Sequence, residues 1–193
     1  FSEIFIKFLK KIKIKNPVIL ICSFQILKKQ MKKLKLKKSI KILDPSKIGQ
    51  YRLDNKVINL ININYNQKNA FQKISSESNK YIKECFNVAF KIINKEKIVK
   101  FINGPISKKF FLKKKYPGMT EYISNYFTTK ETCMLIFNKQ LSVSPVTTHL
   151  PLKLVSKNLR EKNIKKNVIL IHEFYKKILN KIPKIGVLGI NPH

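Results

Sequence analysis

Apolar residues along the chain form two kinds of pattern, continuous runs typical of buried strands and spacings typical of amphipathic helices. The run Val18–Cys22 is wholly apolar, as in a parallel strand buried on both faces. Residues 2–14 place apolar side chains on one helical face and lysines opposite, and Ser2 is positioned to cap this helix. We expect further strands at 40–43, 57–63, 98–102, 132–137, 141–146 and 185–190, and further helices at 24–35, 69–97, 107–115, 120–127, 152–159 and 164–179.

The alternation of strands and helices predicts the fold class. It indicates an α/β protein with layered α/β/α architecture and a largely parallel sheet. The 193 residues suffice for one domain and part of another. Because the chain starts without methionine and stops just after an expected strand, we expect it to be a fragment that lacks a C-terminal part. The helix at 2–14 is interpreted as core-packing; a basic membrane-surface helix is the alternative.

Composition changes the functional picture less than its charge suggests. A net charge of +31 is typical of nucleic-acid binders. However, the only arginines are Arg52 and Arg160, and the lysines are spread along the whole chain. Lys, Ile and Asn are the residues that an AT-rich coding bias enriches, which is our preferred cause. The three cysteines are widely separated, which fits a reducing cytoplasm, and no apolar run is long enough for a membrane span.

Two histidines follow apolar runs at which strands are expected. His149 lies in the loop 147–151 and His193 ends the loop 189–193, while a third loop, 103–108, contains Lys108. In open α/β sheets, ligands bind beyond the carboxyl ends of the strands. Either histidine alone is most simply a packed or surface residue, but two imidazoles at one sheet edge favour a metal site.

A fourth element opens the helix expected at 120–127. Its sequence is Pro-Gly-Met-Thr-Glu, at residues 117–121. Thr120 is placed to act as the N-cap, and the free N–H groups of the first turn would suit a phosphate. A purely structural cap is the alternative interpretation.

Taken together, these elements resemble the 4-hydroxythreonine-4-phosphate dehydrogenase family of pyridoxal phosphate biosynthesis. The stretches that carry the resemblance are NGPISK at 103–108, PGMTEY at 117–122, TTHLPL at 147–152 and LGINPH at 188–193. They occur in the order found in the family and at compatible spacings. The resemblance covers essentially the whole chain and is strongest after residue 98.

The resemblance implies a fold, a reaction and site residues. The fold would be a two-domain α/β architecture similar to isocitrate and isopropylmalate dehydrogenases, incomplete here, with residues 1–193 forming a partial subunit. The enzyme would be a cytoplasmic homodimer with a shared active site that uses NAD or NADP and a divalent metal (Zn, Mg or Co). It would oxidise 4-phosphooxy-threonine, and decarboxylation would give 3-amino-2-oxopropyl phosphate. His149 and His193 match two of three metal-binding histidines, Thr120 a substrate-binding threonine, and Lys108 a lysine of the loop at 103–108.

The sequence also departs from the family pattern. Met119 stands where the family has a substrate-binding histidine, and methionine does not donate a hydrogen bond to a phosphate. A dehydrogenase of a phosphorylated sugar acid, such as a phosphothreonate, is therefore an alternative. A degenerate inactive relative and a basic nucleic-acid-binding protein also remain open. Since the third histidine is absent, we expect these 193 residues alone to bind metal weakly and to be inactive.

Overall fold

The computed structural model describes residues 2–98, 100–113, 115–127 and 131–189. The chain divides into two compact units, residues 1–111 and 112–193. Each unit is described by itself. His193 lies outside the described residues.

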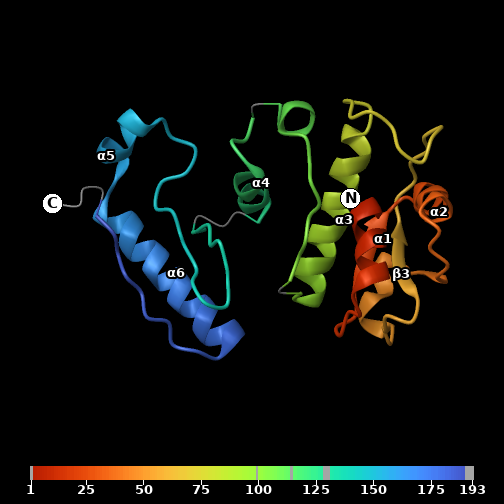
Figure 1. Cartoon of the computed structure of the whole chain (residues 1–193), viewed down its shortest axis with the longest axis horizontal. Helices are drawn as coiled ribbons and strands as arrows, with labels where there is room; N and C mark the ends of the chain where they lie inside the picture. Colours follow the sequence, from red (N-terminus) through yellow and green to blue (C-terminus); the bar gives the residue numbers. More distant parts are fainter. Residues whose placement is uncertain (1, 99, 114, 128–130, 190–193) are drawn as a thin grey trace. The chain divides into compact units, whose positions relative to one another are not determined.

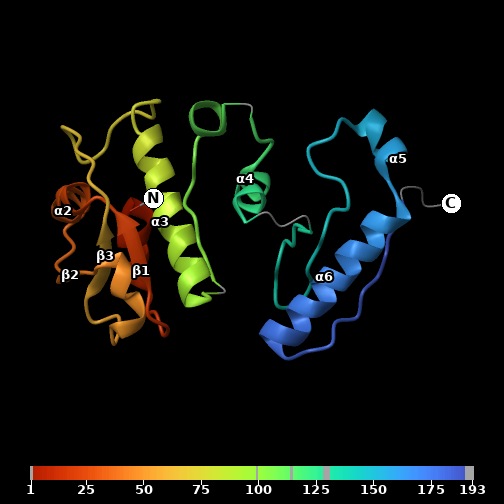
Figure 2. The same ribbon diagram turned by 180° about the vertical axis from the view of Figure 1, so that it is seen from behind.

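The first unit is built on a small parallel sheet. Its strands are β1 (Ile19–Cys22), β2 (Ile40–Ile42) and β3 (Ile58–Asn62), in the order β1-β3-β2 (Figures 1 and 2). Both neighbours of β3 run parallel to it. The apolar runs therefore predicted these strands and their parallel arrangement correctly.

Helices cover both faces of this sheet, which confirms the α/β/α layering. Helices α1 (Ser2–Lys11) and α2 (Phe24–Lys33) cover one face, and α3 (Asn79–Glu96) covers the other (Figure 2). Successive strand residues point to opposite faces, so Leu20 packs with Leu27 of α2 while Ile21 packs with Ile92 of α3. The core is thus two apolar layers on a shared sheet.

The ends of the helices differ from the sequence predictions in instructive ways. Ser2 is the first helical residue rather than a cap, and its hydroxyl donates to Gln30 Oε1 at 2.6 Å. Ser23 is the N-cap of α2, with its hydroxyl accepting from the Ile26 N–H at 3.4 Å. The connection between β2 and β3 contains the 3₁₀ helix η1 (Pro45–Gln50).

Every named element among the described residues of the second unit is a helix: α4 (Met119–Tyr126), η3 (Leu152–Leu154), α5 (Val155–Asn158) and α6 (Glu161–Leu179). The π-helix η2 (Lys108–Leu112) precedes them, and all but its last residue belong to the first unit. Helix α6 anchors the segment before His149. Its Tyr175 hydroxyl donates to Ser142 Oγ at 2.9 Å, and Asn167 Nδ2 donates to the Pro145 carbonyl at 3.4 Å.

Four predicted strands are not observed. The described residues of 98–102, 132–137, 141–146 and 185–190 form no named strand, and a single antiparallel bridge joins Ile136 to Val143. These segments carry exposed apolar side chains, with Ile102 79% and Leu188 94% exposed. A strand requires a hydrogen-bonding neighbour along its length, and beyond the Ile136–Val143 bridge the described residues give these segments no such pairing.

No helix within the described ranges combines the length and the apolar composition that a bilayer crossing requires.

Candidate functional site

The chain reaches helix α4 through a turn that ring contacts and a hydrogen bond hold in place. The rings of Tyr116 and Tyr122 meet edge-on with their centroids 5.5 Å apart, and the Tyr116 hydroxyl accepts from Asn125 Nδ2 at 3.1 Å. Gly118 is the N-cap residue, and no side chain caps the helix there. The prediction that Thr120 is the N-cap is therefore wrong, because the helix begins at Met119 and Thr120 is its second residue.

Thr120 nevertheless faces an open depression beside α4. The depression has a volume of about 390 Å³ and lies within the second unit. Its lining mixes hydroxyl, carboxylate and apolar side chains: Thr120, Ile123, Ser124, Phe127, Glu131, Thr132, Cys133 and Leu170. A small polar ligand with an apolar edge would match this lining.

His149 sits in an unusual backbone conformation. Its φ is 58°, in the left-handed region that few residues other than glycine adopt. The other described residues with positive φ each follow a helical segment, where such a conformation ends the helix: Lys35, Lys97, Lys113 and Asn180. His149 lies in a loop instead, and strain of this kind is concentrated at functional sites.

The start of helix α4 and the loop 147–151 meet at Gly118. A Cβ atom on Gly118 would lie 2.8 Å from Glu121 Oε2 and 3.2 Å from His149 Nε2. Gly118 is buried and its extended backbone (φ −157°) suits any residue, so the close approach of these two groups is what favours glycine. The structure thus brings the 117–121 element and the 147–151 loop together.

The remaining predicted site residues are placed less informatively. Met119 is half-buried as the first residue of α4. Lys108 is exposed on η2 and belongs to the first unit, whereas Thr120 and His149 belong to the second. Because His193 lies outside the described residues, its approach to His149 stays a prediction.

Sequence reasoning missed Glu121 and Gly118. Both were visible in the 117–121 element, but only Thr120 and Met119 received roles. The signal that could have found Glu121 is an acidic residue in the first turn of a helix that lacks a side-chain cap.

The local donor set fits a divalent cation in part. The exposed imidazole of His149 is a common ligand of zinc, and the Glu121 carboxylate approaches the same small volume, where it could either bind the ion or orient the imidazole. Among the described residues, no group of three or more His, Cys, Asp or Glu side chains could hold a metal ion. The described residues therefore supply a partial shell.

The cysteines do not supplement this shell. Burial raises the pKa of both Cys22 and Cys85 to about 12, so both thiols are protonated at neutral pH. Burial also raises the pKa of Cys133 in the depression, against the opposing effect of Lys166. A raised pKa disfavours the thiolate that nucleophilic attack requires. Among the described residues, none of the three cysteines belongs to a group of three or more side chains that could hold a metal ion.

A second depression lies at the carboxyl ends of β1 and β3. It has a volume of about 350 Å³ and lies at the start of α2. Two of its backbone donors are already used: the Ser23 N–H donates to the Tyr81 hydroxyl and the Phe24 N–H to Asn62 Oδ1. We assign no ligand to it.

Comparison with known proteins places this geometry in context. Residues 13–193 match the family model described as pyridoxal phosphate biosynthetic protein PdxA. A 4-hydroxythreonine-4-phosphate dehydrogenase of Sulfurihydrogenibium sp. is 32% identical over 200 residues, covering 100% of this chain and 59% of that protein. A putative D-threonate 4-phosphate dehydrogenase of Oceanobacillus iheyensis is 32% identical over 126 residues, covering 64% of this chain and 38% of that protein.

Solved structures agree on the fold. A 4-hydroxythreonine-4-phosphate dehydrogenase from Klebsiella pneumoniae superposes with a TM-score of 0.82 at 21% identity, over 100% of this chain and 60% of that one. The chain thus spans about three fifths of the length of such relatives. Because the family model matches nearly the whole chain, the protein belongs to the PdxA family of pyridoxal phosphate biosynthetic proteins.

Proposed function

We propose that the protein, at its full expressed length, oxidises 4-phosphooxy-threonine with NAD or NADP in the presence of a divalent metal ion (Zn, Mg or Co). The hydroxyl carbon would give up a hydride to the nicotinamide, and its hydroxyl would release a proton. The resulting β-keto acid would lose CO2 and yield 3-amino-2-oxopropyl phosphate. This reaction would serve pyridoxal phosphate biosynthesis in the cytoplasm, in a homodimer with a shared active site.

The single observation that carries this proposal is the meeting of His149 with the start of α4 at Gly118. In the family, the 147–151 loop carries a metal-binding histidine and the 117–121 element carries a substrate-binding threonine. The approach at Gly118 brings these two motifs together. The dehydrogenases among the relatives support the reaction class.

Each residue has a defined part in the proposal. His149 would hold the metal with a neutral imidazole, which leaves the positive charge of the ion uncancelled. When bound, the metal would supply Lewis-acid polarisation of the substrate oxygen. The Thr120 hydroxyl would donate to a substrate phosphate, aided by first-turn N–H groups that receive no side-chain cap.

A phosphorylated threonate is the second candidate substrate. The Oceanobacillus relative, named for D-threonate 4-phosphate, favours it. Met119 keeps this alternative open, because a methionine there removes a hydrogen-bond donor that the family uses on its substrate. The two substrates differ in bearing an amine or a hydroxyl next to the carboxylate.

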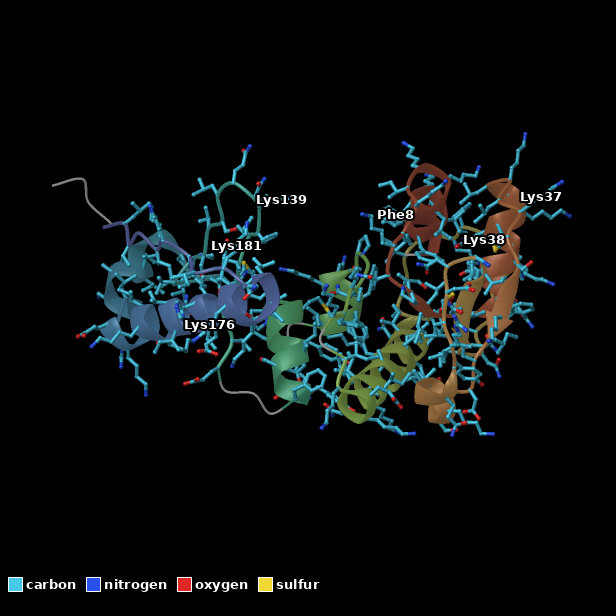
Figure 3. All side chains as sticks on the ribbon, turned by 90° about the horizontal axis from the view of Figure 1, so that it is seen from below. Phe8, Lys37, Lys38, Lys139, Lys176 and Lys181 are labelled. Carbon is cyan, nitrogen blue, oxygen red and sulfur yellow. The ribbon has the colours of Figure 1, made fainter. Side chains whose placement is uncertain are left out.

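The distribution of lysines gives no support to nucleic-acid binding as the function. Lysines project from both units, as the labelled Lys37 and Lys38 of the first and Lys139, Lys176 and Lys181 of the second show (Figure 3). A nucleic-acid site is indicated by basic residues gathered in one stretch or along one helix, which the spread of lysines through both units does not favour.

The test is NADH formation by the purified protein at its full expressed length, with each candidate substrate and added metal. We expect turnover of 4-phosphooxy-threonine, release of CO2, and loss of both in His149→Ala. Turnover of phosphothreonate alone would select the second candidate, and turnover of neither would refute the proposal. We propose that residues 1–193 alone are inactive, because their described part supplies an incomplete metal shell.

A further inference from the structure

One carboxylate oxygen of Glu121, in the first turn of helix α4, is buried without a hydrogen-bond donor among the described residues. Its Oε2 atom is almost wholly removed from solvent and receives no hydrogen bond from any described residue. A buried carboxylate oxygen without a donor is costly, since it loses its hydration without replacement. The positive end of the helix dipole reduces this cost but does not supply a donor to Oε2.

The imidazole of His149 lies close to this oxygen, although the two form no hydrogen bond in the structure. Glu121 Oε2 and His149 Nε2 approach the same small volume from opposite loops, the volume that a Cβ on residue 118 would fill. A neutral imidazole has one N–H and one lone pair. When one ring nitrogen faces a carboxylate, that nitrogen carries the proton and the other presents its lone pair.

We propose that Glu121 is the positioning residue of His149, and that its carboxylate accepts the imidazole N–H and thereby fixes the tautomer and ring orientation that bind the metal. Histidines that bind metals almost always donate their other ring N–H to such a partner. The inference rests on the proposed function, because it assigns a role within the same site.

The backbone of His149 supports this assignment. A left-handed residue outside a helix end is maintained only where its surroundings determine it. A carboxylate anchored on α4 would provide such a restraint. The close approach of Glu121 and His149 also leaves no room for a Cβ atom on residue 118 unless these side chains move.

The test compares Glu121→Gln with wild type in the protein at its full expressed length. Glutamine at this helical position preserves the size of the side chain and any capping role, because glutamate and glutamine are interchangeable in a capping box. It replaces one acceptor oxygen by an amide donor and removes the charge. Glu161→Gln is the matched control, since Glu161 lies on α6 with a 77% exposed side chain.

Two readouts are required. The first is Zn²⁺ affinity by competition with a chromophoric chelator, for which we expect a loss of about 10- to 100-fold in Glu121→Gln and none in Glu161→Gln. The second is the ¹⁵N chemical shift of the His149 ring in the metal-free protein at fixed pH. We expect a single tautomer in wild type and a mixture, or the other tautomer, in Glu121→Gln.

The outcomes separate this inference from the proposed function. An unchanged tautomer in Glu121→Gln would overturn the inference, even if metal affinity fell, because Glu121 would then act as a ligand or only on helix stability. If wild type bound no divalent metal, the metal requirement of the proposed function would fall, while the ring shifts would still decide the pairing. If His149→Ala lost metal and Glu121→Gln did not, the inference alone would fail.

Discussion

Adding a single methyl group at Gly118 should disturb the site while leaving the fold nearly intact. In Gly118→Ala the new Cβ would lie 2.8 Å from Glu121 Oε2 and 3.2 Å from His149 Nε2. Ordinary van der Waals contact begins near 3.4 Å. The carboxylate must therefore withdraw by roughly half an ångström and the imidazole by somewhat less.

The expected cost to stability is small. The backbone at Gly118 is extended, a conformation that alanine adopts without strain, and the atoms that clash are the ends of side chains. Replacing glycine by alanine at an N-cap costs roughly 0.5–1 kcal/mol. Metal affinity should fall by about tenfold or more, because the displaced groups include a proposed ligand and its partner.

Two other glycines provide controls for this experiment. A Cβ on Gly49 would meet Glu96 Oε2 at 2.7 Å, so Gly49→Ala reproduces a clash with a carboxylate in the first unit. A Cβ on Gly186 would meet nothing within 4 Å. We expect both controls to bind Zn²⁺ as wild type does.

The assays are urea unfolding for stability and chelator competition for Zn²⁺ affinity. A Gly118→Ala protein that binds Zn²⁺ within twofold of wild type would refute the reasoning, since the convergence at Gly118 would then have no functional consequence. An equal loss of affinity in Gly49→Ala would refute it as well, because the effect would not be local.

Three further predictions concern the first unit. Phe90 is wholly buried, so Phe90→Ala should lower the free energy of unfolding by about 3–5 kcal/mol in urea titrations; a loss below about 1 kcal/mol would contradict its place in the core. Asn59 is 1% exposed and its Nδ2 donates to the carbonyls of Val18 and Asp54, so Asn59→Ala should cost roughly 2 kcal/mol in the same assay, and a neutral effect would argue against these bonds. Because burial raises the pKa of Cys22 and Cys85 from 9.0 to about 12, the unfolded thiols lose their protons first, and stability that is fully present below pH 9 should decline as pH rises toward 12. Unfolding titrations across this range should show a shallower decline in Cys22→Ala, and an unchanged slope would refute the assignment.

The parts of the fold that were predictable are those where burial and strand pairing coincide. The run at 18–22 is wholly apolar, and the run at 57–63 is apolar except for Asn59 and Asn62. Both became strands because each found a parallel neighbour. The run at 185–190 is equally apolar but has no strand among its described residues. An apolar run indicates that a segment is suited to burial, whereas the partner that makes it a strand is a property of the whole fold.

Some features of the candidate site were also predictable from the sequence, and others were not. The family resemblance implied that His149 and the 117–121 element belong to one site. The structure brings the two segments together at Gly118, while the roles of their residues stay a prediction. Periodicity did not predict that Gly118, rather than Thr120, is the N-cap residue of α4, because alternative N-caps two residues apart leave the helical pattern unchanged. The burial of Glu121 Oε2 is a tertiary property and has no local signature.

The proposed function depends most directly on a divalent metal held by His149. The most direct measurement is the metal content and Zn²⁺ affinity of wild type, His149→Ala and His172→Asn, each at full expressed length. His172 is half-buried on α6 and has no part in the proposed site, so it controls for the loss of a histidine. We predict that His172→Asn binds as wild type does and that His149→Ala loses the metal; retention of wild-type affinity in His149→Ala would contradict the claim.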